Sequence, residues 1–226
     1  MTLPPGQHRI DGFPRFGAHL SQPPPAVSAE PTIEICGAVR APLTVPLARL
    51  AALPHQETIA DFHCVAGWSA TELHWEGVTF ATLYRLIIEP ALLPGSQLTH
   101  LAFVGLDGLR SIMTLEDALA ENVLIAQRLA GRPLDSDHGA PARLVTPDHY
   151  GYLNTKHLCR IELHTRQPNG DHHPSPIIQV GLQLLSPHPR ARVWQEERHR
   201  YLPPRVVRPI YRRLIPIIRA LSAHGS

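Results

Sequence analysis

One stretch decides the expected fold: Phe62-His63-Cys64-Val65-Ala66-Gly67-Trp68-Ser69. It places a single cysteine between an apolar run and a Gly-Trp turn. Thiolate is a soft ligand that suits redox metals. A cysteine at the point where a buried strand ends in a glycine turn is therefore placed to present its sulfur to a cofactor. A lone cysteine is more often a small buried hydrophobe, and the octet by itself does not exclude that alternative.

Two later segments favour the cofactor interpretation. They are His138-Gly139-Ala140-Pro141-Ala142-Arg143-Leu144-Val145 and Tyr150-Gly151-Tyr152-Leu153-Asn154-Thr155-Lys156. Together with the octet they resemble the molybdopterin-binding domain of the sulfite oxidase family, over about residues 31–164. In that family a cysteine in a Cys-Val-x-x-Trp type segment ligates molybdenum. A Gly-x-Pro-x-Arg segment and a later Tyr-Gly-x-x-x-x-Lys segment hold the pterin and its phosphate.

The resemblance implies a role for each matching residue. Cys64 would ligate molybdenum, and the Arg143 fork suits phosphate or pterin carbonyl groups. Lys156, the only lysine of the chain, would bind the phosphate beside a helix that we expect to begin within residues 154–158. Asp107 lies in a turn that lines the cofactor in relatives, although Asp107-Gly108 is also an ordinary turn. The implied cofactor-binding residues are Cys64, Gly105, Asp107, His138, Arg143, Tyr152, Asn154, Thr155 and Lys156.

Aromatic and histidine side chains near these segments are candidates for the substrate mouth. The catalytic candidates are Cys64, His63, Trp68 and Tyr150, and His149 is a further candidate for the mouth. Trp68 is equally well explained as a core aromatic residue. Asp171-His172-His173 has no accompanying metal-binding spacing, and we interpret it as a solvated loop.

The octet departs from the sulfite oxidase pattern in one respect. Sulfite oxidases follow the ligand cysteine with arginines that hold the sulfite dianion, whereas here no lysine or arginine occurs between Cys64 and Arg85. The segment is more similar to that of the bacterial protein-methionine-sulfoxide reductase branch. We therefore expect a bacterial-type molybdenum-pterin oxidoreductase that moves an oxygen atom to or from a small sulfur- or nitrogen-containing substrate. A sulfoxide-like substrate is favoured over sulfite. Because no haem motif occurs, electrons would come from a separate electron-transfer protein.

Two alternatives belong to other functional classes. The first is a non-catalytic module that keeps the fold and carries the cofactor or docks a partner. The second is nucleic-acid or anionic-membrane binding by residues 190–219, which hold nine arginines and two glutamates. We do not expect the second to be the main function, and the basic segment offers a surface on which a partner can dock.

Composition agrees with a folded domain outside the membrane. The chain has 226 residues, of which 43% are hydrophobic and 18% charged. No apolar run approaches the roughly 18 residues of a membrane span. Cys36, Cys64 and Cys159 form no paired motif, Cys36 is expected to be structural, and no export signal is visible, so we expect a cytoplasmic protein.

The order of elements predicts an α+β fold of the sulfite-oxidase type, with mixed sheets and short helices. We expect an extended arm at 1–31, the cofactor-binding domain at 32–166 and a Pro/His/Arg-rich extension at 167–226. Prolines at 203, 204, 209 and 216 predict short helical pieces in that extension. Strands are expected at 32–37, 58–64, 98–104, 123–129, 142–146 and 159–163, and helices at 45–53, at 80–88 and after Thr114.

Overall fold

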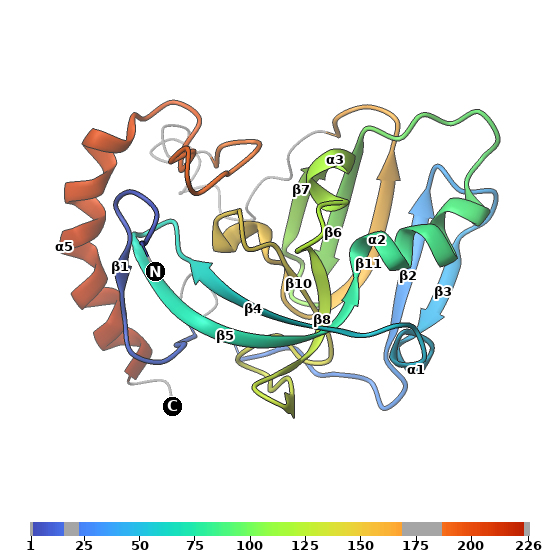
Figure 1. The fold of residues 1–226 in the computed structure, drawn as a ribbon, viewed down its shortest axis with the longest axis horizontal. Coiled ribbons are helices and arrows are strands. Elements are labelled where there is room, and N and C mark those ends of the chain that lie inside the picture. Colours follow the sequence, from blue (N-terminus) through green and yellow to red (C-terminus); the bar gives the residue numbers. More distant parts are fainter. Residues whose placement is uncertain (1, 16–22, 169–186, 224–226) are drawn as a thin grey trace.

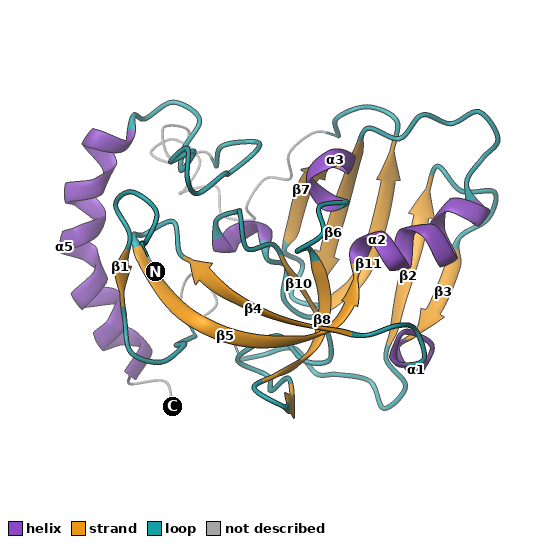
Figure 2. Cartoon of the chain, viewed as in Figure 1, coloured by secondary structure: helices purple, strands orange, loops and turns teal. Residues whose placement is uncertain are grey.

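The computed structural model describes residues 2–15, 23–168 and 187–223, and two β-sheets form its centre (Figure 1). The first sheet has the strand order β1-β5-β8-β10, with β4 also pairing with β5 and β9 with β8. Its strands are β1 (His8–Arg9), β4 (Gln56–His63), β5 (Trp68–Thr79), β8 (Leu124–Leu129), β9 (Arg132–Pro133) and β10 (Arg143–Val145). The long β4–β5 hairpin runs across the molecule from the cysteine loop to the second sheet (Figure 2).

The second sheet has the order β3-β2-β11-β6-β7. It contains β2 (Thr32–Gly37), β3 (Leu43–Pro46), β6 (His100–Gly105), β7 (Arg110–Thr114) and β11 (Leu158–His164). Strands β11 and β2 run parallel with Glu162 opposite Cys36, and the other pairs of this sheet are antiparallel. The mixed sheets confirm the α+β expectation. Strand β2 has the predicted bounds, and each of the other predicted strands occurs within two residues of the expected ends.

The main core joins side chains of both sheets with those of the helices near the second sheet. The interior side chains of β2 and β11, Ile33, Ile35 and Ile161, are at most 1% exposed. Phe80 of α2 (Phe80–Leu83) packs edge-on against Phe103 with 5.4 Å between ring centroids. Burying side chains of this size supplies the main driving force for the fold.

The helices near the second sheet differ from the predictions in detail. The helix expected at 45–53 is shorter, because strand β3 extends to Pro46 and α1 covers only Leu47–Ala51. Helix α2 continues as a π-helical segment, Tyr84–Ile88, and a 3-10 turn, Glu89–Ala91. The cap predicted at Thr114 is confirmed, since its hydroxyl oxygen accepts a 3.1 Å hydrogen bond from the Asp117 amide at the start of α3 (Leu115–Ala118).

The helix expected within residues 154–158 is wrong. The only helical element there in the described chain is a 3-10 turn at Gly151–Leu153, which precedes the predicted range. Asn154 and Thr155 use their side chains inside the protein, His157 adopts a positive φ of 52°, and β11 begins at Leu158. In the described chain no α-helix therefore begins at this position, and the predicted contribution of a helix N-terminus to phosphate binding is absent here.

The expectation of short helical pieces in the C-terminal extension is also wrong. Helix α5 runs unbroken over 20 residues, Pro204–Ala223. Pro204 opens the helix, where its missing N–H is not needed. Pro209 and Pro216 are about two turns apart, so they lie on the same side, and both are exposed. The carbonyl groups that lose their hydrogen bonds thus face water. No helix in the described part of the chain is long and apolar enough to span a membrane.

Both ends of the chain pack against the same end of the first sheet. Figure 1 shows α5 beside β1, at the end of β4 and β5 far from α2. Strand β1 of the arm runs parallel to β5, with His8 opposite Trp68. The histidine pair of Asp171-His172-His173 lies outside the described residues.

Candidate functional site

Cys64 lies in the tight loop that joins β4 to β5. Its amide donates to the Trp68 carbonyl at 2.8 Å, and its carbonyl accepts from the Gly67 amide at 2.9 Å. The Gln7 side chain of the arm donates a further 3.1 Å hydrogen bond to the Cys64 carbonyl. The backbone around the cysteine is therefore fixed from both sides, as expected for a strand that ends in a glycine turn.

The thiol itself lies in an apolar cluster. Cys64 is 7% exposed and belongs to a cluster with Ala66, Trp68 and Ala70, against which Phe62 and Tyr211 of α5 pack. Burial raises the pKa of the Cys64 thiol to about 12. Only a strong Lewis acid would keep this sulfur ionised at neutral pH, and a bound metal does so outright.

Arg143 of β10 is a fully buried cation. Its side chain is 0% exposed and donates only to carbonyl oxygens, those of His138 at 3.0 Å and Asn154 at 3.4 Å. Its Nε is buried without a partner, and no carboxylate in the described residues pairs with it. Burial lowers the pKa of this guanidinium to about 9. An uncompensated buried arginine is costly unless an anion completes the site.

Lys156 lies next to Arg143 and is a second basic side chain that forms no hydrogen bond to a carboxylate in the described residues. Its Nζ donates to the Asp137 carbonyl oxygen. Burial, with the charges of Arg143 and Arg15, lowers the pKa of Lys156 to about 7. Gly139, with φ of +101°, passes against Lys156 so closely that a Cβ there would lie 3.0 Å from the lysine Cβ. The glycine of the sequence motif thus lets the lysine lie against the loop before Arg143.

The arm covers this cationic region. Phe13 lies 4.9 Å from the His138 ring, and its carbonyl lies 2.8 Å from His138 Nε2. The Arg143 guanidinium carbon lies 5.7 Å from the Phe13 ring centroid and 5.8 Å from that of Phe62. Phe62 also lies 5.6 Å from Trp68 in the cysteine cluster, so one aromatic wall connects the thiol with the cations.

A comparison with family models adds the deciding observation. The model of the family described as "Oxidoreductase molybdopterin binding domain" matches residues 20–172, more than half of the chain. The chain belongs to this family. The matched range contains Cys64, Arg143 and Lys156, so the expected cofactor, molybdenum held by molybdopterin, and the enzyme class are confirmed at the level of the family.

Individual relatives agree with this membership. The protein-methionine-sulfoxide reductase catalytic subunit MsrP of Gluconobacter oxydans is 32% identical over 154 residues, covering 61% of this chain and 48% of that protein. The oxidoreductase YuiH of Bacillus subtilis is 28% identical over 199 residues, covering 87% of this chain and 91% of that protein. The chain thus spans about half the length of MsrP. Its match to YuiH extends beyond the range of the family model.

A solved structure confirms the predicted fold type. The sulfane dehydrogenase SoxCD from Paracoccus pantotrophus superposes with a TM-score of 0.56 at 21% identity, covering 65% of this chain and 41% of that chain. At this identity the likeness shows the fold alone.

The structure brings some predicted site residues of this molybdopterin-binding domain together and separates others. His138, Arg143 and Lys156 form one group, and the 105–108 turn abuts it, because a Cβ on Gly105 would lie 2.4 Å from the Lys156 carbonyl. Asn154 and Thr155 point inward, where Asn154 bonds Thr146 at 2.9 Å and Thr155 bonds Ser111 at 2.6 Å. The Tyr152 hydroxyl instead donates to the His188 carbonyl of the extension at 3.2 Å.

The residues proposed for the substrate mouth differ in their contacts and burial. His63 Nδ1 lies 2.8 Å from the Ser69 hydroxyl, and burial lowers the pKa of His63. Tyr150 is fully buried beside the cysteine loop, with its pKa raised to about 12 by burial. Trp68 is 2% exposed within the cysteine cluster, as its core interpretation expects. His149 is buried near Asp117, with 3.9 Å between Nε2 and the carboxylate.

Sequence reasoning missed three contributors: Trp75, Arg15 and Arg198. The Trp75 ring centroid lies 5.0 Å from the Arg143 guanidinium carbon. Arg15 of the arm lies 3.8 Å from the Asp137 carboxylate, and Arg198 of the extension donates to the Val65 carbonyl in the cysteine loop. Neither segment carries a local sequence motif. Their roles become visible only when distant segments are folded together.

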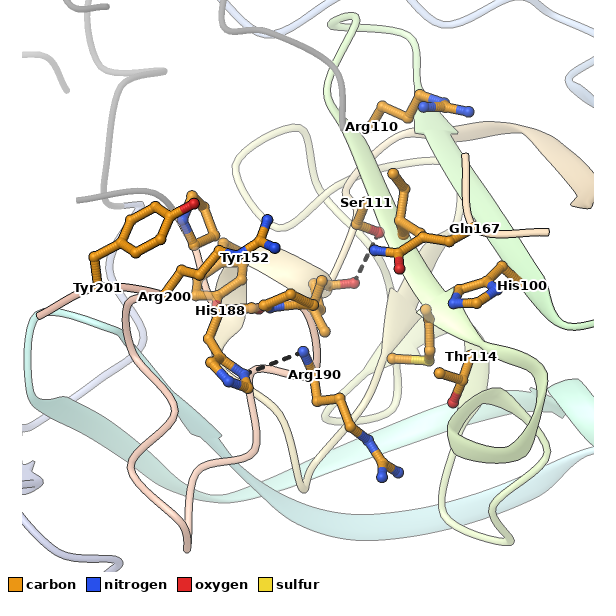
Figure 3. Close-up of a pocket in the computed structure, with 15 residues that line it drawn as sticks. His100, Arg110, Ser111, Thr114, Tyr152, Gln167, His188, Arg190, Arg200 and Tyr201 are labelled. Atoms are coloured by element: carbon orange, nitrogen blue, oxygen red, sulfur yellow. Dashed lines mark hydrogen bonds between the residues drawn. The ribbon is translucent and has the colours of Figure 1, made fainter. Parts of the chain in front are cut away.

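A separate pocket of about 560 Å³ lies between β7 and the extension (Figure 3). Arg110 in its wall pairs with Glu162 at 2.8 Å, and the Arg190 side chain pairs with Asp117. Tyr152 and Leu153 also line it, whereas Cys64, Arg143 and Lys156 do not. This pocket is therefore distinct from the site around the thiol.

The side chains around the thiol fit the molybdenum-pterin group. Arg143 and Lys156, which form no hydrogen bond to a carboxylate among the described residues, suit its phosphate, and the buried Arg143 Nε is an available donor for a polar group of the cofactor. Cys64 offers the soft sulfur that molybdenum needs.

Proposed function

We propose that this chain is a molybdenum-pterin oxidoreductase that moves an oxygen atom to or from a small sulfur- or nitrogen-containing substrate. The observation that carries the proposal is the arrangement of Cys64 and the Arg143–Lys156 cations along the aromatic wall of Phe62. One end of that wall suits a metal, and the other suits an anion. The cofactor of the family contains both a metal, molybdenum, and an anionic phosphate.

Each residue then has a role that its contacts explain. Cys64 holds the metal, and Arg143, Lys156 and His138 hold the pterin and its phosphate. The cofactor, when bound, supplies a metal centre that exchanges two electrons and one oxygen atom. The protein excludes water around it through Trp68 and Tyr150, which are at most 2% exposed. His63, Trp68 and Tyr150 remain proposed as residues of the substrate mouth.

Elemental analysis tests this proposal directly. The protein is purified from a host that makes the cofactor, with Cys64→Ser as the test variant and Cys159→Ser as the control, since Cys159 is also a free thiol. We expect about one molybdenum per chain and a thiolate-to-metal absorption band in the wild type and the control. Cys64→Ser should lose the band and turnover. Full activity in Cys64→Ser would refute the ligand role, and a folded protein without metal would favour the non-catalytic module.

We propose that the substrate is sulfoxide-like rather than sulfite. The support is the loop after Cys64, which carries no basic residue, and the similarity to MsrP. Reduction of a sulfoxide takes up two electrons and two protons and releases water. Turnover of methionine sulfoxide with a reduced dye, without oxidation of sulfite by an acceptor dye, is the expected result. The opposite pair of results would reverse the assignment.

We propose that the electron-transfer partner docks on the outer face of α5. The inner face packs Tyr211 against the Cys64 cluster, so a partner on the outer face is about one helix diameter, roughly 10 Å, from the loop. On the flank of the helix that leads to the outer face, Val206 and Ile210 are 49% and 51% exposed. Arg205, Arg212 and Arg213 are exposed nearby, and no acidic side chain in the described chain pairs with them. These features suit a partner with an acidic surface and an apolar centre.

Salt dependence tests the docking proposal. Reduction of the loaded protein by an acidic redox protein should slow steeply with ionic strength, because exposed charges are screened. The Arg212→Glu/Arg213→Glu variant should slow it at low salt, with Arg132→Glu, an exposed arginine on β9, as the control. Equal rates in both variants would exclude the α5 surface. Binding to anionic vesicles instead of the redox protein would assign the surface to a membrane.

The compartment remains a proposal. We propose a cytoplasmic location, because Cys36, Cys64 and Cys159 are all free thiols, as a reducing compartment favours. Cell fractionation tests it.

A further inference from the structure

Arg198 joins three separate parts of the chain at the cysteine loop. Its side chain is 1% exposed. Nη1 donates to the carbonyl of Val65, the residue after Cys64, and Nη2 donates to the Gly6 carbonyl of the arm at 3.0 Å. The guanidinium carbon lies 5.2 Å from the Tyr150 ring centroid. One side chain of the extension therefore holds the cysteine loop, the arm and the Tyr150 ring in a fixed arrangement.

The charge of Arg198 is only partly compensated. Its hydrogen-bond partners are carbonyl oxygens, and the paired carboxylate, Glu196, lies 3.9 Å away. That carboxylate also accepts a 2.8 Å hydrogen bond from Arg208 of α5. Glu196 is thus shared between two arginines, and a net positive charge remains beside the loop. A cation at this position stabilises negative charge on a nearby metal–thiolate unit, since charges in a buried setting interact strongly.

We infer that Arg198 is a positioning residue for the Cys64 ligand, and that its charge raises the reduction potential of the bound metal. The sequence after Cys64 carries no basic residue, and the fold brings this cation from the C-terminal extension. The extension therefore completes the metal site itself, in addition to any docking role. This inference rests on the proposed role of Cys64 as the ligand.

Two substitutions of Arg198 separate its charge from its geometry. Arg198→Met removes the charge and keeps most of the side-chain volume. Arg198→Lys keeps a charge but cannot donate to the Val65 and Gly6 carbonyls as a planar fork. Glu196→Gln leaves Arg198 in place and removes the carboxylate that offsets it. Arg160→Gln is the control, because Arg160 pairs with Glu34 on the second sheet and both side chains are more than 40% exposed.

The measurements are the molybdenum content, the thiolate-to-metal absorption band and the reduction potential of the metal. The potential is obtained from a redox titration that is monitored by electron paramagnetic resonance. We expect Arg198→Met to lower the potential and shift the band. Arg198→Lys should have the reduction potential of the wild type, because it keeps the charge, but a shifted absorption band, because it loses the planar fork. Glu196→Gln should raise the potential, and Arg160→Gln should change neither quantity.

The outcomes distinguish this inference from the proposed function. An unchanged potential and band in loaded Arg198→Met would overturn the role of Arg198 while leaving Cys64 as the ligand. If Arg198→Met does not fold, an unchanged potential in Glu196→Gln would overturn the electrostatic role. Retention of the thiolate band in Cys64→Ser would instead refute the ligand assignment on which the inference rests.

Discussion

The guanidinium of Arg143 lies over the indole of Trp75, with 5.0 Å between the guanidinium carbon and the ring centroid. This contact partly stabilises a cation that no carboxylate in the described residues neutralises. The aromatic ring holds the fork in place while its orphaned Nε stays available for a ligand. The arrangement is suited to a bound anion that is not part of the chain.

Replacing Arg143 should therefore affect the cofactor more than the fold. For Arg143→Met we expect cofactor retention to fall by at least about 10-fold, the lower end of losses at residues that support a metal site. The free energy of unfolding of the cofactor-free protein should change by less than about 3 kcal/mol. Its lost hydrogen bonds to two carbonyls are offset by removal of a buried charge. Molybdenum per chain after gel filtration and denaturant unfolding measure the two effects. Wild-type retention of the cofactor would contradict the assignment.

Lys156 should make the stability of the cofactor-free protein depend on pH. Its folded pKa of about 7 lies below the ordinary value of 10.5, so between these values the unfolded chain binds more protons. The free energy of unfolding should therefore rise with pH above 7. The part of this rise that is due to Lys156 ends near pH 10.5, where the lysine of the unfolded chain also loses its proton. Because other groups titrate above pH 9, the test compares the wild type with Lys156→Met between pH 7 and 8.5. The variant should show the smaller slope, and equal slopes would refute the shift.

The elements that sequence predicted correctly are those with strong local signals. Thr32–Gly37 alternates polar and apolar residues, and Thr114 carries a cap with Asp117 three residues later. The cysteine turn was likewise visible because Gly67 follows the apolar run. Local chemistry was sufficient in each case.

The misses have physical causes. The prolines of α5 argued against one long helix. Because Pro209 and Pro216 lie on the exposed side of α5, water can replace the backbone hydrogen bonds that they remove. No strand was predicted at β5, which mixes charged and buried residues. Of the candidate site, Cys64, Arg143 and Lys156 came from motif resemblance, whereas Arg198 reaches its partner Val65 across 133 residues of sequence. Contacts of that kind depend on tertiary packing and have no local signal.

Gly151 should be intolerant of a side chain. A Cβ there would lie 2.1 Å from Cζ of Phe62, so Gly151→Ala must displace the aromatic wall. We expect destabilisation of about 1–3 kcal/mol and weaker cofactor retention, as for other overpacked sites. Phe62→Leu in the same chain should recover part of the stability, because it removes the clashing atoms. Additive losses in the double variant would show that the two residues do not interact.

Pro209 offers the opposite test, a stabilising change. Pro209 is exposed inside α5, where proline removes a backbone hydrogen bond and costs about 3 kcal/mol relative to alanine in a helix interior. Part of this cost is already relieved by water, so Pro209→Ala should stabilise α5 by less than that amount. Because the inner face of the helix packs on the Cys64 cluster through Tyr211, the variant should also slow alkylation of Cys64 in the cofactor-free protein. Pro133→Ala on β9 is the control, since that strand lies outside α5. Faster alkylation in Pro209→Ala would contradict this prediction and mean that the proline helps to hold α5 over the thiol.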